Sequence, residues 1–129
     1  MTLTAQKSVL IVDDSAYVRQ ALCELFKREG DIEVCGEAEN GKDAIKKAQE
    51  LRPDLIVLDL SMPVMNGFDA ARILKRLMPT VPLIMYSAFG DRLAENQARL
   101  IGISEVVSKS EHASVLILKA RSLLYSDAA

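Results

Sequence analysis

The stretch that decides the fold is "VLIVDDSAYVRQ", residues 9–20, in which an apolar run meets two adjacent aspartates. Residues 9–12 are continuously apolar, which is typical of a strand covered on both faces of a parallel sheet. Asp13 and Asp14 follow at once, and neighbouring carboxylates are costly to bury unless a cation compensates for their charge. The stretch therefore predicts a buried parallel strand with a cation site at its carboxyl end.

Composition places the chain among ordinary globular domains. It has 129 residues, of which 50% are hydrophobic and 26% charged, and its net charge is −2. The signs are interspersed, so no basic stripe indicates nucleic acid and no polybasic cluster indicates a membrane surface. "MTLTAQKS" lacks the apolar region of a signal peptide and no apolar run is long enough to span a membrane, so we expect a cytoplasmic protein. Cys23 and Cys35 are isolated and are interpreted as buried small hydrophobes.

Strand-like and helix-like patterns alternate along the chain. The expected strands are residues 9–12, 32–38, 55–58, 81–86 and 105–107, of which 32–38 suits a sheet edge. Apolar residues at helical spacing predict helices around residues 18–26, 44–48, 68–77, 93–101 and 113–124. Gly30, Pro79 and Gly102 are expected to end the first, third and fourth of these. Five strand–helix units predict a single α/β domain over residues 1–129, with its core at about 8–125, right-handed crossovers and helices on both sheet faces.

Ligands of such sheets bind beyond the carboxyl ends of the strands. The expected strand ends deliver Asp13, Asp14, Asp59, Ser87 and Lys109. Each alone has a simpler interpretation, as a helix cap, a turn residue, a loop hydroxyl or a surface charge, but their joint occurrence at one edge indicates a site. Three carboxylates suit Mg²⁺, and a carboxylate can act as a nucleophile toward phosphorus. Lys109 and the metal would neutralise a phosphoryl group whose oxygens Ser87 and nearby backbone amides would hold.

The ordered motifs "VDDS", "LDLSMPVMNG", "YSA" and "SK" resemble the receiver domain of two-component response regulators, across essentially the whole chain. The resemblance implies a flavodoxin-like (βα)5 fold with strand order 2-1-3-4-5 and Asp59 as the phosphoacceptor. It assigns Mg²⁺ to Asp14, Asp59, the backbone carbonyl of Ser61 and, through water, Asp13. It assigns the phosphoryl group to Lys109, Ser87 and the backbone amides of Leu60 and Ala88.

The implied function is that of a signalling switch, which catalyses only its own phosphorylation and dephosphorylation. Its partners would be a histidine kinase or phosphotransfer protein upstream and an unidentified protein target downstream, with phosphorylation-dependent dimerisation left open. Neither nucleic acid nor a membrane is an expected partner of this chain itself.

Three departures from the family pattern carry expectations of their own. Ser110 stands where proline usually follows Lys109, so we expect a trans bond or a locally altered loop there, with Ser110 capping the last helix and Glu111 in its first turn. Val106 replaces the usual aromatic residue three positions before Lys109, so the inward ring movement of the family is not available.

Tyr86 and Phe89 are candidates for that aromatic role. The third departure concerns Ser61 and Phe89, which stand two residues beyond Asp59 and Ser87, respectively, at positions that tune dephosphorylation in the family. There, Phe89 would shield the acyl phosphate from water.

Four alternatives compete with this interpretation. An FMN carrier of the same topology is disfavoured because Asp13 and Asp14 would repel the phosphate. A phosphomonoesterase is disfavoured because Ser61 stands where a second aspartate should follow Asp59, and no room is left for a cap domain. A receiver fold that is never phosphorylated, acting only in protein binding, is a third alternative. The fourth is the receiver part of a longer DNA-binding regulator, which "EAENGKDAI" and "KS" resemble.

Overall fold

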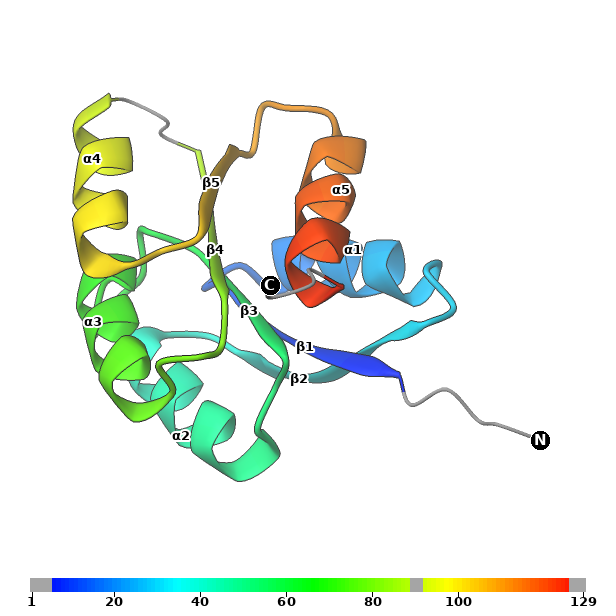
Figure 1. The fold of residues 1–129 in the computed structure, drawn as a ribbon, viewed down its shortest axis with the longest axis horizontal. Helices are drawn as coiled ribbons and strands as arrows, with labels where there is room; N and C mark the ends of the chain where they lie inside the picture. Colours follow the sequence, from blue (N-terminus) through cyan, green and yellow to red (C-terminus); the bar gives the residue numbers. More distant parts are fainter. Residues whose placement is uncertain (1–5, 89–91, 126–129) are drawn as a thin grey trace.

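The fold is a five-stranded parallel sheet between two layers of helices, as a computed structural model shows for residues 6–88 and 92–125 (Figure 1). The strands are β1 (Lys7–Val12), β2 (Ile32–Ala38), β3 (Leu55–Leu58), β4 (Leu83–Ser87) and β5 (Glu105–Ser108). The helices are α1 (Ala16–Lys27), α2 (Gly41–Leu51), α3 (Gly67–Leu77), α4 (Arg92–Ile101) and α5 (Ala113–Leu124). The order β2-β1-β3-β4-β5 confirms the predicted flavodoxin-like topology, including the edge position of β2.

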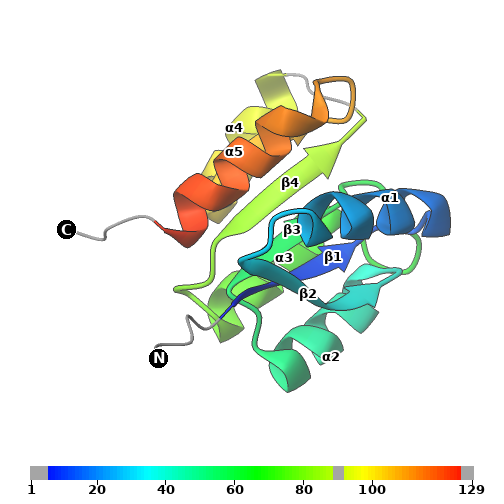
Figure 2. The ribbon, with the colours of Figure 1, turned by 90° about the vertical axis from the view of Figure 1, so that its right-hand side faces the viewer.

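The continuous apolar runs are explained by the two cores, one on each face of the sheet. Val9 and Ile11 of β1 pack into the core beneath α1 and α5, whereas Leu10 and Val12 pack into the core beneath α2, α3 and α4. Figure 2 shows α1 and α5 on one side of the sheet and α2 and α3 on the other. Because successive side chains of a strand point to opposite faces, a strand buried on both sides needs apolar residues at every position.

Two predicted boundaries were wrong for local reasons. β4 begins at Leu83 rather than at residue 81, because Pro82 has no N–H to donate to a neighbouring strand. Its carbonyl does accept a bond of 3.1 Å from the Ile56 amide. α1 ends at Lys27 with Arg28 as its C-cap, so Gly30 lies in the turn that follows and does not end the helix. By contrast, Gly102 has a φ of 100° directly after α4, as expected for a glycine that ends a helix.

The predicted cap of the last helix was also wrong. α5 begins at Ala113, and its N-cap is His112, whose Nδ1 accepts from the Ser114 amide at 3.1 Å. Ser110 and Glu111 precede the helix because both are bonded back to the end of β5. The Ser110 hydroxyl lies 2.7 Å from that of Ser108, and a Glu111 carboxylate oxygen accepts from the Ser108 amide at 3.2 Å.

None of the helices in the described part of the chain has the length and apolar character needed to span a bilayer.

Candidate phosphoacceptor site

The parallel register brings the carboxyl ends of four strands to one edge of the sheet. Val12 pairs with Leu58 and Ser87 pairs with Ser108, so the residues that follow these pairs emerge side by side. The Lys109 amide donates to the Ser87 carbonyl at 2.8 Å, which ties the end of β5 to the end of β4. All five residues that the sequence places at strand ends therefore lie at this edge.

Three carboxylates form the centre of the site, and we call Asp13, Asp14 and Asp59 the acidic cluster. Each offers an oxygen that lies within 4.8 Å of the other two. Asp13 and Asp59 are buried, with exposed fractions of 1% and 5%, whereas Asp14 is exposed. Hard oxygen donors with one side open to water suit Mg²⁺, which usually keeps several waters when it binds a protein.

Lys109 is the cation paired with the acidic cluster. Its Nζ lies 2.7 Å from Asp13 Oδ2 and 3.4 Å from Asp59 Oδ1. Burial and the charge of Asp13 raise the pKa of Asp59, and Lys109 offsets this only in part. Burial opposes the charged form of Lys109, but its bond to Asp13 and the charge of both aspartates raise its pKa above the usual range. The site therefore holds more negative charge than its one ammonium compensates.

The loop after β1 fixes the orientation of Asp13. Asp13 Oδ1 accepts from the Ser15 amide at 2.9 Å, and the Ser15 hydroxyl caps α1 by accepting from the Val18 amide at 3.3 Å. Arg19 also donates to the Asp13 carbonyl at 2.6 Å and pairs with Glu37 at 3.1 Å. Sequence reasoning missed Arg19, because a single arginine within a helix carries no motif.

The loop after β3 is closed tightly behind Asp59. The Gly67 amide donates to the Leu60 carbonyl at 2.8 Å, and a Cβ at Gly67 would overlap the Asp59 carbonyl. Within this loop Val64 has a φ of 69°, which is strained for a β-branched residue. Ser61, two residues after Asp59, is exposed. Backbone packing thus holds this loop in one shape.

Tyr86 lies next to Lys109. The centroid of its ring lies 5.9 Å from Lys109 Nζ, a distance at which an ammonium is attracted to an aromatic face. Tyr86 is half-buried against the core beneath α1 and α5, and this burial raises the pKa of its hydroxyl. Of the two aromatic candidates, Tyr86 is therefore next to Lys109, and Phe89 lies outside the described residues.

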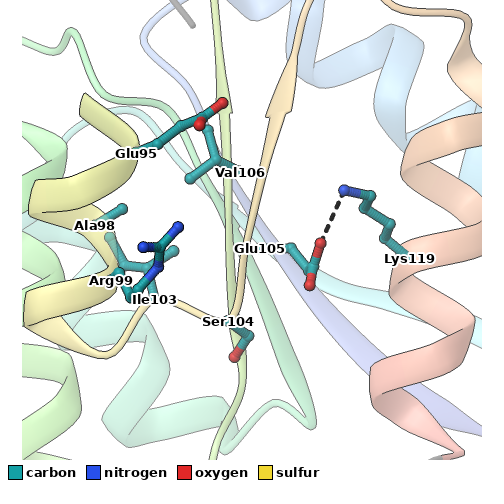
Figure 3. A pocket seen from close by; sticks show the side chains of 8 residues that line it. All are labelled: Glu95, Ala98, Arg99, Ile103, Ser104, Glu105, Val106 and Lys119. Atoms are coloured by element: carbon teal, nitrogen blue, oxygen red, sulfur yellow. Dashed lines mark ion pairs between the residues drawn. The ribbon is translucent and has the colours of Figure 1, made fainter. Parts of the chain in front are cut away.

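Two departures from the family pattern, Val106 and Ser110, lie in β5 and just after it. Figure 3 shows the Val106 side chain at a pocket of about 310 Å³ beside α4, which Ala98 and Ile103 also line. The Glu105–Lys119 ion pair of 2.8 Å lies at its other side. No member of the acidic cluster lines this pocket. The peptide bond between Lys109 and Ser110 is trans, as expected.

This fold and edge define a class: doubly wound α/β domains with an acidic site at the strand ends. A family model described as response regulator receiver domain matches residues 9–121. The chain therefore belongs to the response regulator receiver domain family, which acts in two-component and chemotaxis signalling.

Relatives of two kinds are similar to the chain. Chemotaxis protein CheY of Thermotoga maritima is 39% identical over 103 residues, which cover 80% of this chain and 85% of that protein. The protein-glutamate methylesterase/protein-glutamine glutaminase of Pyrococcus abyssi is 47% identical over 96 residues, covering 74% of this chain but 26% of that protein. The chain thus spans about a quarter of the length of that methylesterase.

A solved structure confirms the fold. The response regulator domain of Thermotoga maritima CheB superimposes with a TM-score of 0.88 at 30% identity, covering 95% of this chain and 98% of that one.

Proposed function

We propose that the chain is a phosphoacceptor switch in which Asp59 takes a phosphoryl group from the phosphohistidine of a histidine kinase or phosphotransfer protein. The observation that supports this most strongly is the buried Asp59 carboxylate, which has an oxygen within 4.8 Å of oxygens of Asp13 and Asp14 and lies 3.4 Å from the Lys109 ammonium. A buried, undercompensated carboxylate at a solvent-facing edge is suited to exchange partners with an incoming cation and an anionic group.

In the transfer step, a carboxylate oxygen of Asp59 attacks phosphorus and the phosphorus–nitrogen bond to the donor imidazole breaks, which forms an acyl phosphate. The Lys109 ammonium would stabilise the charge on the transferred group. Ser87 and the amides of Leu60 and Ala88 would donate to its oxygens, because these residues directly end or follow β3 and β4.

Mg²⁺ fits the oxygen donors of the acidic cluster. Asp14, Asp59, the Ser61 carbonyl and, through water, Asp13 would hold the ion. When bound, it supplies positive charge that neutralises the phosphoryl oxygens. Ser61 is exposed two residues after Asp59, and we propose that it and Phe89 tune the lifetime of the acyl phosphate.

The output is proposed to be a change in protein–protein contacts. The 47% identity to a methylesterase of which the chain spans about a quarter favours one specific form of this output: a receiver that controls an attached methylesterase domain. The receiver of a DNA-binding regulator remains the alternative proposal, as does phosphorylation-dependent dimerisation.

The test is to incubate the protein with acetyl phosphate, with and without Mg²⁺, and to measure its intact mass. We expect a single phosphoryl gain that requires Mg²⁺ and is absent from Asp59→Asn. Asp69→Asn, an exposed aspartate of α3, is the matched control and should be phosphorylated like the wild type. A folded wild-type protein that gains nothing with acetyl phosphate or with a phosphorylated histidine kinase would overturn the proposal.

A further inference from the structure

A groove between α3 and α4 lies on the sheet face that also carries α2. Figure 1 shows these two helices next to each other, and the space between them is an open groove of about 900 Å³. Its lining residues come from the middle and the second half of both helices: Arg72, Lys75, Arg76, Asn96, Gln97, Leu100 and Ile101. We call this surface the α3–α4 groove.

The charge of the α3–α4 groove is opposite to that of the chain. Three of its lining residues are cations and none is acidic, although the net charge of the chain is −2. Arg72 pairs with Asp69 on its own helix at 2.9 Å, whereas Lys75 donates to the Val81 carbonyl at 3.1 Å. Neither Lys75 nor Arg76 has a carboxylate partner within residues 6–88 and 92–125.

The position of Lys75 and Arg76 in the last turn of α3 gives a simpler explanation for these two cations, because cations stabilise helix carboxyl ends. That explanation does not cover Leu100. It is 89% exposed, the highest value among the large exposed hydrophobic residues whose burial is described, and it stands at the groove beside the half-buried Ile101. An exposed leucine beside two cations that have no carboxylate partner in the described residues, Lys75 and Arg76, is the composition of a binding surface rather than of a helix end alone.

From this charge and shape we infer that the α3–α4 groove binds an acidic, amphipathic helical segment of a partner protein. Its carboxylates would face Lys75 and Arg76, and an apolar side chain would cover Leu100. A nucleic acid fits less well, because a phosphate backbone has no apolar group to cover Leu100 and because the groove offers only three cations. This inference does not depend on phosphorylation of Asp59, so the binding is expected without a phosphodonor.

The probe is a short acetylated and amidated peptide, with leucine at helical spacing and glutamate or alanine elsewhere. Binding is followed by amide NMR shifts of the labelled protein. We expect shifts concentrated in α3 and α4, and none with a matched peptide that carries lysine for glutamate. Arg76→Glu and Leu100→Ser should each weaken binding about tenfold.

Two matched controls separate the groove from general effects. Lys27→Glu changes an exposed cation in the last turn of α1, and Leu118→Ser changes a leucine of α5 that is 67% exposed. Both should bind the acidic peptide like the wild type. Shifts outside α3 and α4, equal binding of the lysine peptide, or variants that match their controls would overturn the inference. So would an oligothymidylate that binds this groove as tightly as the acidic peptide.

Discussion

Two clusters of carboxylates and cations sit at opposite ends of the sheet, and they are built on different principles. At the carboxyl ends of the strands, the three carboxylates of the acidic cluster share Lys109, and Asp13 and Asp59 are buried. At the amino end of β2, Asp31 accepts two bonds from Arg121, at 2.8 and 3.0 Å, and one from the Tyr125 hydroxyl at 2.7 Å. We call Asp31, Arg121 and Tyr125 the Asp31 cluster.

The direction of the pKa shift distinguishes the two. Burial and like charge raise the pKa of Asp59, whereas the bonds from Arg121 and Tyr125 hold the pKa of Asp31 well below its usual range. The Asp31 cluster is electrostatically satisfied and fastens the end of α5 to the start of β2. The acidic cluster has too little positive charge nearby. This destabilises the folded protein when no cation is bound, but it favours binding of a cation.

The largest effect should follow from removing Lys109, the cation that pairs with the acidic cluster within the described residues. Lys109→Met leaves Asp13 and Asp59 buried without a partner, and we expect the free energy of unfolding to fall by about 2 kcal/mol in metal-free buffer. Excess Mg²⁺ should restore part of this loss, since the ion supplies the missing charge. Urea unfolding with and without Mg²⁺ measures both.

Lys119→Met is the matched control, because Lys119 forms a partly exposed pair with Glu105 at 2.8 Å. It should cost less than about 1 kcal/mol and be indifferent to Mg²⁺. Equal losses for the two variants would remove the contrast between a site and a surface ion pair.

A smaller loss is expected from Asp31→Asn, which removes the charge that Arg121 and Tyr125 stabilise. The folded-state pKa of Asp31 is lowered, so its contribution is fully present above the unfolded value of about 3.9 and fades as the pH falls below it. The variant should therefore be less stable than the wild type at pH 7, and the two curves should converge in acid. Thermal unfolding between pH 7 and pH 2 tests this, and a constant difference across that range would contradict it.

The smallest effect has the opposite sign. Asp14 is exposed, and its charge contributes to the raised pKa of Asp59. Asp14→Asn removes repulsion, so metal-free stability should rise by about 0.5 kcal/mol, while the stabilisation by added Mg²⁺ should shrink. Glu50→Gln, an exposed carboxylate of α2, is the control and should change neither quantity. A destabilised Asp14→Asn protein would show that the acidic cluster is not short of cations.

Sequence reasoning reached the α/β class and the residues at the sheet edge because buried parallel strands and their polar ends both leave a local pattern, whereas the strand order came from the resemblance to receiver domains. Asp59 and Lys109 are 50 positions apart, yet each follows an apolar run, so topology alone brings them together. Arg121 and Asp31 are 90 positions apart and follow no such rule, so their pairing was not foreseeable.

Short loops were the other limit. Ser110 was the expected N-cap of α5, but His112 caps the helix because Ser110 is bonded back to Ser108. Which of several neighbouring side chains caps a helix depends on the backbone conformation of the loop before it, and the sequence does not reveal that conformation.

The ring of Tyr86 against Lys109 gives the protein an optical property. The chain contains no tryptophan and three tyrosines, and Tyr17 and Tyr125 are both exposed. Of the three tyrosines, Tyr86 is the one whose ring lies beside the ammonium of the site, at 5.9 Å. Any binding event that moves Lys109 away from Tyr86 changes the electric field at the tyrosine ring. Near-ultraviolet absorbance and tyrosine emission should therefore report, without a label, whether a ligand is bound at the acidic cluster.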